Sequence, residues 1–158
     1  MNVLFLLGVG SVLLVSWLAV ARLVPARWRL LTWTIVVVGA VVPWTSWVGH
    51  SHWGRVDWLP FSPPLRKRDI VLNVLLYVPL GYFFVRDGRF GHRVVMAVAL
   101  AFGLSLATEF TQVYSHGRFP AMTDVVTNTA GAWIGAAIAR REARQPVRAG
   151  SREAVDRA

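Results

Sequence analysis

Five long apolar runs occupy most of this sequence, and they restrict its possible folds more than any other feature. A helix of about 20 apolar residues crosses a hydrocarbon core of roughly 30 Å, because each residue adds about 1.5 Å. Inside a membrane the backbone polar groups of each segment must be satisfied internally, which favours helices. The sequence therefore predicts an all-α fold, a polytopic transmembrane helical bundle of about five spans with a short fifth span. The expected spans are residues 2–21, 30–48, 69–85, 94–114 and 125–139.

The composition agrees with a membrane location. Of the 158 residues, 55% are hydrophobic and 16% are charged, which is too apolar for a soluble domain of this size to bury. The runs leave room for a single transmembrane domain over residues 1–140. Residues 141–158 are rich in Arg, Ala and Glu without apolar periodicity, so we expect a basic, disordered cytoplasmic tail there.

The net charge of +9 comes from 17 Lys and Arg residues against 8 Asp and Glu residues. Because the basic residues fall between the apolar runs and in the tail, they indicate topology and contacts with anionic headgroups. We therefore expect membrane lipids, and no nucleic acid, as partners. The arginines of the first loop and of the tail place the amino terminus outside the cell membrane and the carboxyl terminus in the cytoplasm, although the basic run 66–68 favours the opposite orientation.

Three of the runs have an unusual feature, and for the first and the fifth it leaves an alternative open. Ala19-Val20-Ala21 resembles a signal-peptide cleavage site, but the chain starts without the positive charge of such peptides, which favours a retained helix. Pro43 interrupts the second run, and we expect neighbouring helices to satisfy the carbonyl group that it frees. The fifth run would be about 22 Å long as a helix, so a half-inserted helix is also consistent with it.

Polar residues gather at the ends of three expected spans. Since successive spans alternate in direction, the start of the third, the end of the fourth and the start of the fifth share one membrane face in either orientation. Spacings of three and four residues place each polar group on one side of its helix. These positions predict a candidate binding cluster, with no catalytic residue assigned. Its members at or near the span ends are Asp69, Asn73, Glu109, Gln112, Asp124 and Asn128, and Arg118 joins them from the loop before the fifth span.

Glu109 is the most informative of these residues, because it lies about five residues inside an apolar span. A lone carboxylate in such a position costs on the order of 3 kcal/mol on insertion scales. Arg118, in the following loop, is the nearest basic residue in sequence. One interpretation is a structural ion pair between the two, with the amides bridging helices. The other is a cavity open to the outer leaflet, in which Arg118 binds an anionic or amide-bearing group.

The sequence offers little for metal or cofactor binding. The loop residues His50, His52 and His116 match neither HExxH nor another zinc signature, so we expect surface histidines and no metal site. The chain has no P-loop and no GxGxxG motif, so we expect no cofactor.

Glycines indicate where helices approach closely. Gly131 and Gly135 form a GxxxG pattern on the fifth span, and Gly81 lies in the third span. Because small residues let helix backbones come close together, we expect these three to serve helix packing. Association with another helix through the fifth span is one form that this packing can take.

Three segments carry a resemblance to a known family. They are DIVLNVLLYVPLG from residue 69, SLATEFTQ from residue 105 and TDVVTNTAGAWIG from residue 123. Together with Arg118 they resemble the VanZ-like family of bacterial membrane proteins, named for a teicoplanin-resistance protein, over residues 69–139. Asn73 stands where many relatives have His, and an amide cannot titrate as an imidazole does; Phe119-Pro120 after the arginine also departs from the pattern. The family pattern falls on Asp69, Asn73, Gly81, Glu109, Gln112, Arg118, Asp124, Asn128 and Gly131.

This resemblance implies a role in the cell envelope and reduced sensitivity to glycopeptides such as teicoplanin. The leading hypothesis is that a polar outer-leaflet pocket binds a lipid-linked or glycopeptide-related molecule without chemistry. A membrane enzyme acting on a lipid-linked envelope precursor is an alternative, with Glu109 or Asp124 as acid or base. A structural module that packs through its fifth helix without a ligand is another.

Overall fold

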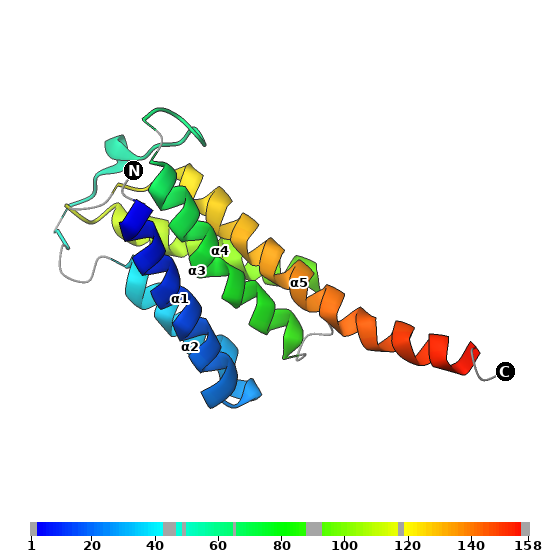
Figure 1. The fold of residues 1–158 in the computed structure, drawn as a ribbon. Coiled ribbons are helices and arrows are strands. Elements are labelled where there is room, and N and C mark those ends of the chain that lie inside the picture. The colour runs from blue at the N-terminus through cyan, green and yellow to red at the C-terminus, as the bar shows by residue number, and fades with distance from the viewer. Residues whose placement is uncertain are drawn as a thin grey trace.

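The chain folds into five α-helices and one short 3-10 helix, without strands in the part that the structure describes. This part of the computed structural model comprises residues 3–42, 47–48, 50–64, 66–87, 93–116 and 119–155, with side chains described between residues 7 and 144. The all-α prediction is confirmed. The helices are α1 (Val3–Leu23), α2 (Ala26–Val41), α3 (Lys67–Arg86), α4 (Val94–Gln112) and α5 (Met122–Val155), and the 3-10 helix is η1 (Trp53–Arg55) (Figure 1).

Length and composition fit a membrane environment. Within the described residues, α3 and α4 are long and apolar enough to cross a bilayer, and residues Leu7–Leu23 of α1 form a shorter apolar helix. Large apolar side chains also point away from the bundle, among them Leu23 on α1, Ile35 on α2 and Val95 on α4. Because lipid is as apolar as the core, a membrane protein can expose such side chains on its outer surface.

Helix α3 is the centre of the bundle, and α5 lies along it (Figure 1). Glycines permit this close approach. A Cβ atom added at Gly81 would lie 1.9 Å from the carbonyl oxygen of Ala132, and one added at Gly135 would lie 1.8 Å from that of Val78. Gly131 of α5 is similarly close to the backbone of α3. The glycine face of α5 is therefore occupied by α3 of the same chain.

Two tryptophans connect α1 and α2 with α3. The indole N–H of Trp33, on α2, donates a hydrogen bond of 2.9 Å to the carbonyl oxygen of Leu76. On α1, the ring of Trp17 packs edge-on against that of Tyr82, with 5.3 Å between the centroids. A buried tryptophan needs a partner for its N–H group, so the Trp33 bond fixes the depth at which α2 packs.

The second helix ends earlier than the sequence predicts. Helix α2 ends at Val41, not near residue 48, and Val42 already has an extended backbone with φ of −69° and ψ of 131°. The cause is Pro43, because a proline disfavours the helical conformation in the residue before it.

The fifth helix is the longest of the described helices, with 34 residues, and it extends well beyond the short apolar run 125–139 that we expected as a span. At about 1.5 Å per residue it is about 51 Å long, and Figure 1 shows its carboxyl-terminal half extending past the other helices. The helix extends beyond residue 140 to Val155, within the segment for which the sequence predicts a basic tail. Ala, Arg, Glu and Gln dominate the first turns of this segment, and all four favour helix.

Candidate functional site

The start of α3, the end of α4 and the start of α5 lie at the same end of the bundle, as their alternating directions require (Figure 1). Polar side chains connect these ends. The amide of Asn73 on α3 donates to the hydroxyl of Thr127 on α5 over 3.5 Å. The amide of Asn128 on α5 donates to the hydroxyl of Ser105 on α4 over 2.9 Å. The structure therefore brings polar residues of all three helices together.

Glu109 fixes the beginning of α5 against the end of α4. Glu109 is buried, with only 5% of its surface exposed. One carboxylate oxygen accepts a bond of 2.8 Å from the backbone N–H of Ala121, the residue before α5, and the other accepts one of 3.4 Å from the amide of Gln112. Hydrogen bonds to an ionised acceptor are stronger than neutral ones. This geometry fits a structural role for Glu109.

Two polar atoms beside this network lack a hydrogen bond. The hydroxyl of Tyr77 faces Ser105 and Thr108 but makes no hydrogen bond of normal geometry, and the side-chain oxygen of Asn128 is also unbonded. Both residues are almost fully buried. An unsatisfied buried polar group costs about 1–3 kcal/mol. These two atoms therefore mark the place where a further hydrogen-bonding group would be most favourable.

The predicted residues separate into two layers. The inner layer consists of Glu109, Gln112 and Asn128, which are buried. The outer layer consists of Asp69, Asn73 and Asp124, which are partly exposed. The side chain of Asp69 is 34% exposed and lies 3.2 Å from the guanidinium of Arg68. Arg118, the expected basic member of the cluster, lies outside the described residues.

A loop segment covers this end of the helices. We call residues 47–48 and 50–62 of the α2–α3 connection the cap. The cap exchanges backbone hydrogen bonds of 2.9 Å with the chain around the start of α5: the N–H of Asp57 donates to Pro120, and the N–H of Met122 donates to Asp57. In addition, the N–H of Phe61 donates to the hydroxyl of Thr123 over 2.8 Å.

Phe61 shows how firmly this part of the cap is held. Its φ of 62° lies in the left-handed region, which is unfavourable for a bulky residue. Such a conformation persists where the surroundings determine it, and here the hydrogen bond to Thr123 does so. The cap is therefore part of the site and not a loose connection.

Sequence reasoning left several contributors out of the predicted binding set. Tyr77, Ser105 and Thr127 lie on the same helix faces as the predicted residues, and their three- and four-residue spacing gave a usable indication. The cap contributes through backbone groups between segments far apart in the chain, for which the sequence contains no indication.

Chemically, the two layers differ in what they can bind. The carboxylate of Glu109 in the inner layer is buried, whereas Asp69, Asn73 and Asp124 in the outer layer are partly exposed and so accessible from outside the bundle. Among the described side chains, no group of three or more His, Asp or Glu residues is arranged to hold a metal ion. The arrangement offers hydrogen bonds and charge to a polar molecule.

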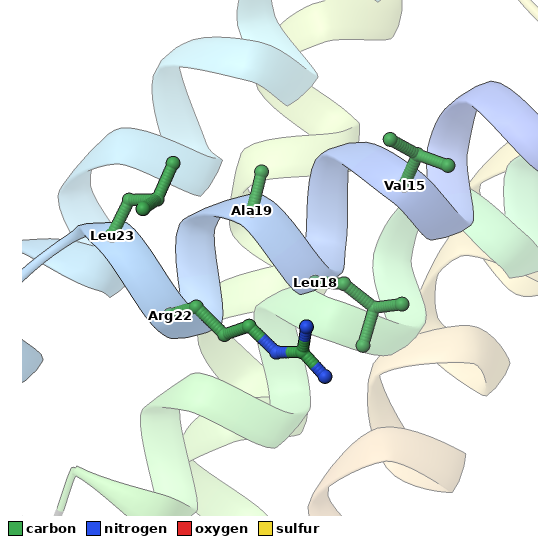
Figure 2. Close-up of a pocket in the computed structure, with 5 residues that line it drawn as sticks. All are labelled: Val15, Leu18, Ala19, Arg22 and Leu23. Carbon is green, nitrogen blue, oxygen red and sulfur yellow. The ribbon is translucent and has the colours of Figure 1, made fainter.

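A separate surface hollow lies on α1 (Figure 2). It is lined by Val15, Leu18, Ala19, Arg22 and Leu23, so one guanidinium borders an otherwise apolar surface. None of these lining residues belongs to the polar cluster. Because a helix near lipid presents such apolar faces along its length, the hollow gives no reason to move the candidate site away from the cluster.

Comparison with known proteins supports the resemblance noted in the sequence. The model of the VanZ/LLP1 family matches residues 9–143, which is most of the chain and includes α1 and α2. The match is therefore wider than the segment 69–139 that carries the recognisable motifs. No curated protein and no solved structure matches the chain.

Proposed function

Since the chain belongs to the VanZ/LLP1 family, we propose that it is a multi-pass protein of the bacterial cell membrane whose polar cluster binds a lipid-linked or glycopeptide-related molecule and thereby lowers sensitivity to teicoplanin. The amino terminus lies outside and the carboxyl terminus in the cytoplasm. In this orientation the cluster and the cap face the outer leaflet, where envelope precursors and glycopeptides meet.

One observation carries the proposal: three helix ends gather polar side chains at one end of an otherwise apolar bundle, and two buried polar atoms there have no hydrogen bond. Ionisable and amide residues are costly within a membrane and are functional by default. The inner layer keeps the helix ends together. The outer layer, Asp69, Asn73 and Asp124, contacts the polar part of the bound molecule.

The acyl or polyprenyl part of a lipid-linked molecule would lie against the exposed apolar side chains of the same helices. On α4, Leu106 and Phe110 are about half exposed, and on α5 Trp133 is 57% exposed. A ligand with a polar head and an apolar chain would thus find both kinds of surface on these helices.

The test uses two substitutions in the outer layer, Asn73→Leu and Asp124→Asn, and a control at the exposed start of α4, away from the cluster, Val95→Leu. Binding of fluorescent teicoplanin and of a labelled lipid-linked cell-wall precursor is measured with the full chain in nanodiscs, and teicoplanin susceptibility is measured in cells. We expect the two outer-layer variants to lose binding and resistance at unchanged protein abundance, while the control retains both. Failure of the wild-type chain to bind either probe would refute the proposal.

A further inference from the structure

Three histidine rings from two loops lie together beside the cap. His50 and His52 belong to the cap, and His116 follows α4. The ring centroids are 4.7 Å apart for His50 and His52, 5.7 Å for His52 and His116, and 6.2 Å for His50 and His116. The cluster therefore lies across the boundary between the cap and the α4–α5 connection.

Backbone contacts make this boundary a defined junction. The N–H of His52 donates to the carbonyl oxygen of Val113 over 2.9 Å, and the N–H of Val48 donates to that of Tyr114 over the same distance. Trp47 forms an isolated antiparallel bridge with Ser115. The histidines thus lie directly on the pairing that holds the first part of the cap to α4.

His52 is arranged to be neutral in this junction. Its Nε2 atom is buried and has no hydrogen-bond partner. An imidazolium donates from both ring nitrogens, so protonation would leave a charged N–H group without an acceptor. Burial lowers the pKa of His52, the charge of Arg55 lowers it further, and so do His50 and His116 when they carry a charge.

We propose that His50, His52 and His116 form a pH-sensitive latch, which holds the cap against α4 when the imidazoles are neutral and releases it on acidification. Release of the cap would open the polar cluster to its ligand, and this consequence rests on the function proposed above. The opening itself depends only on the junction.

The direction follows from linkage between protonation and opening. In the open state His52 is solvated and has a pKa near its ordinary value of 6.5, whereas in the closed state the pKa is lower. Above pH 6.5 neither state binds the proton, so the closed latch is unaffected. As the pH falls from 6.5 to the lowered pKa, the open state binds more protons, and the ratio of open to closed rises by up to about tenfold per pH unit.

The test uses a single spin label on the cap. Because the chain has no cysteine, Gly54→Cys provides one labelling position, and a Cβ atom added at Gly54 meets nothing within 4 Å. Label mobility in the full chain is recorded by electron paramagnetic resonance in nanodiscs between pH 8 and pH 5. We expect the mobile fraction to rise below pH 6.5. A label that stays equally immobile throughout this range would overturn the latch.

Two further substitutions separate His52 from other titrating groups. His52→Gln should remove most of the pH response, and the exposed His116→Gln should reduce it, because losing a neighbouring cation brings the pKa of His52 closer to 6.5. His92→Gln, at the one of the four histidines that does not belong to the cluster, is the control and should respond as the parent does. An unchanged response in both His52→Gln and His116→Gln would refute the proposal. The measurement contains no ligand, so failure of the proposed function does not affect its outcome.

Discussion

Replacement of Glu109 by Gln tests the role that the structure gives to this carboxylate. Glu109 accepts hydrogen bonds from the backbone N–H of Ala121 and from the amide of Gln112. Hydrogen bonds to a charged group contribute about 1.5–3 kcal/mol, against about 1 kcal/mol for neutral pairs. Gln retains one acceptor oxygen for Ala121, but its amide nitrogen then faces the donor group of Gln112. From these two bonds we expect Glu109→Gln to lower the free energy of unfolding by about 1–3 kcal/mol.

The measurement is unfolding of the purified chain in mixed micelles with increasing denaturing detergent, followed by circular dichroism. Glu142→Gln is the matched control. Glu142 pairs with Arg86 over 2.9 Å, but both side chains are about half exposed, at 49% and 52%. Exposed ion pairs contribute about 0–1 kcal/mol, so this control should change stability little. Equal losses in the two variants, or a more stable Glu109→Gln chain, would show that the buried carboxylate does not hold α4 and α5 together.

Two further predictions concern helix packing. Gly135→Ala should prevent the native contact of α5 with α3 and greatly reduce the folded yield, because the added Cβ would lie 1.8 Å from the carbonyl oxygen of Val78; Gly103→Ala, where nothing lies within 4 Å, should leave the yield unchanged or higher. Size-exclusion profiles compare the two, and a normal profile for Gly135→Ala would contradict the packing. Trp33→Phe removes the bond to Leu76 and should destabilise the chain by about 1–3 kcal/mol in the same unfolding assay, whereas a neutral effect would mean that this bond does not position α2.

The sequence predicted much of the arrangement of the polar residues because this arrangement depends on local rules. Apolar run length predicts helices, and helix alternation brings the ends of α3, α4 and α5 to one face without any knowledge of packing. The three- and four-residue spacing of Ser105, Glu109 and Gln112 predicts a shared helix face, and the buried α4 side chains do lie on one. The end of α2 just before Pro43 could also be predicted from the sequence, since the proline restricts the backbone of the residue before it.

The sequence by itself determined that the chain is all-helical and apolar enough for a membrane, and that its costly polar residues lie at one end of the bundle. These properties follow from composition, from the length of the apolar runs and from the spacing of polar residues along each helix. Only the tertiary structure decided which of them are buried. Glu109 is bonded inside while Asp69 remains partly exposed, since burial depends on how three helices and the cap converge. The histidine cluster and the cap pairing also required the fold, because contacts between His52 and Val113 join segments that no local pattern relates.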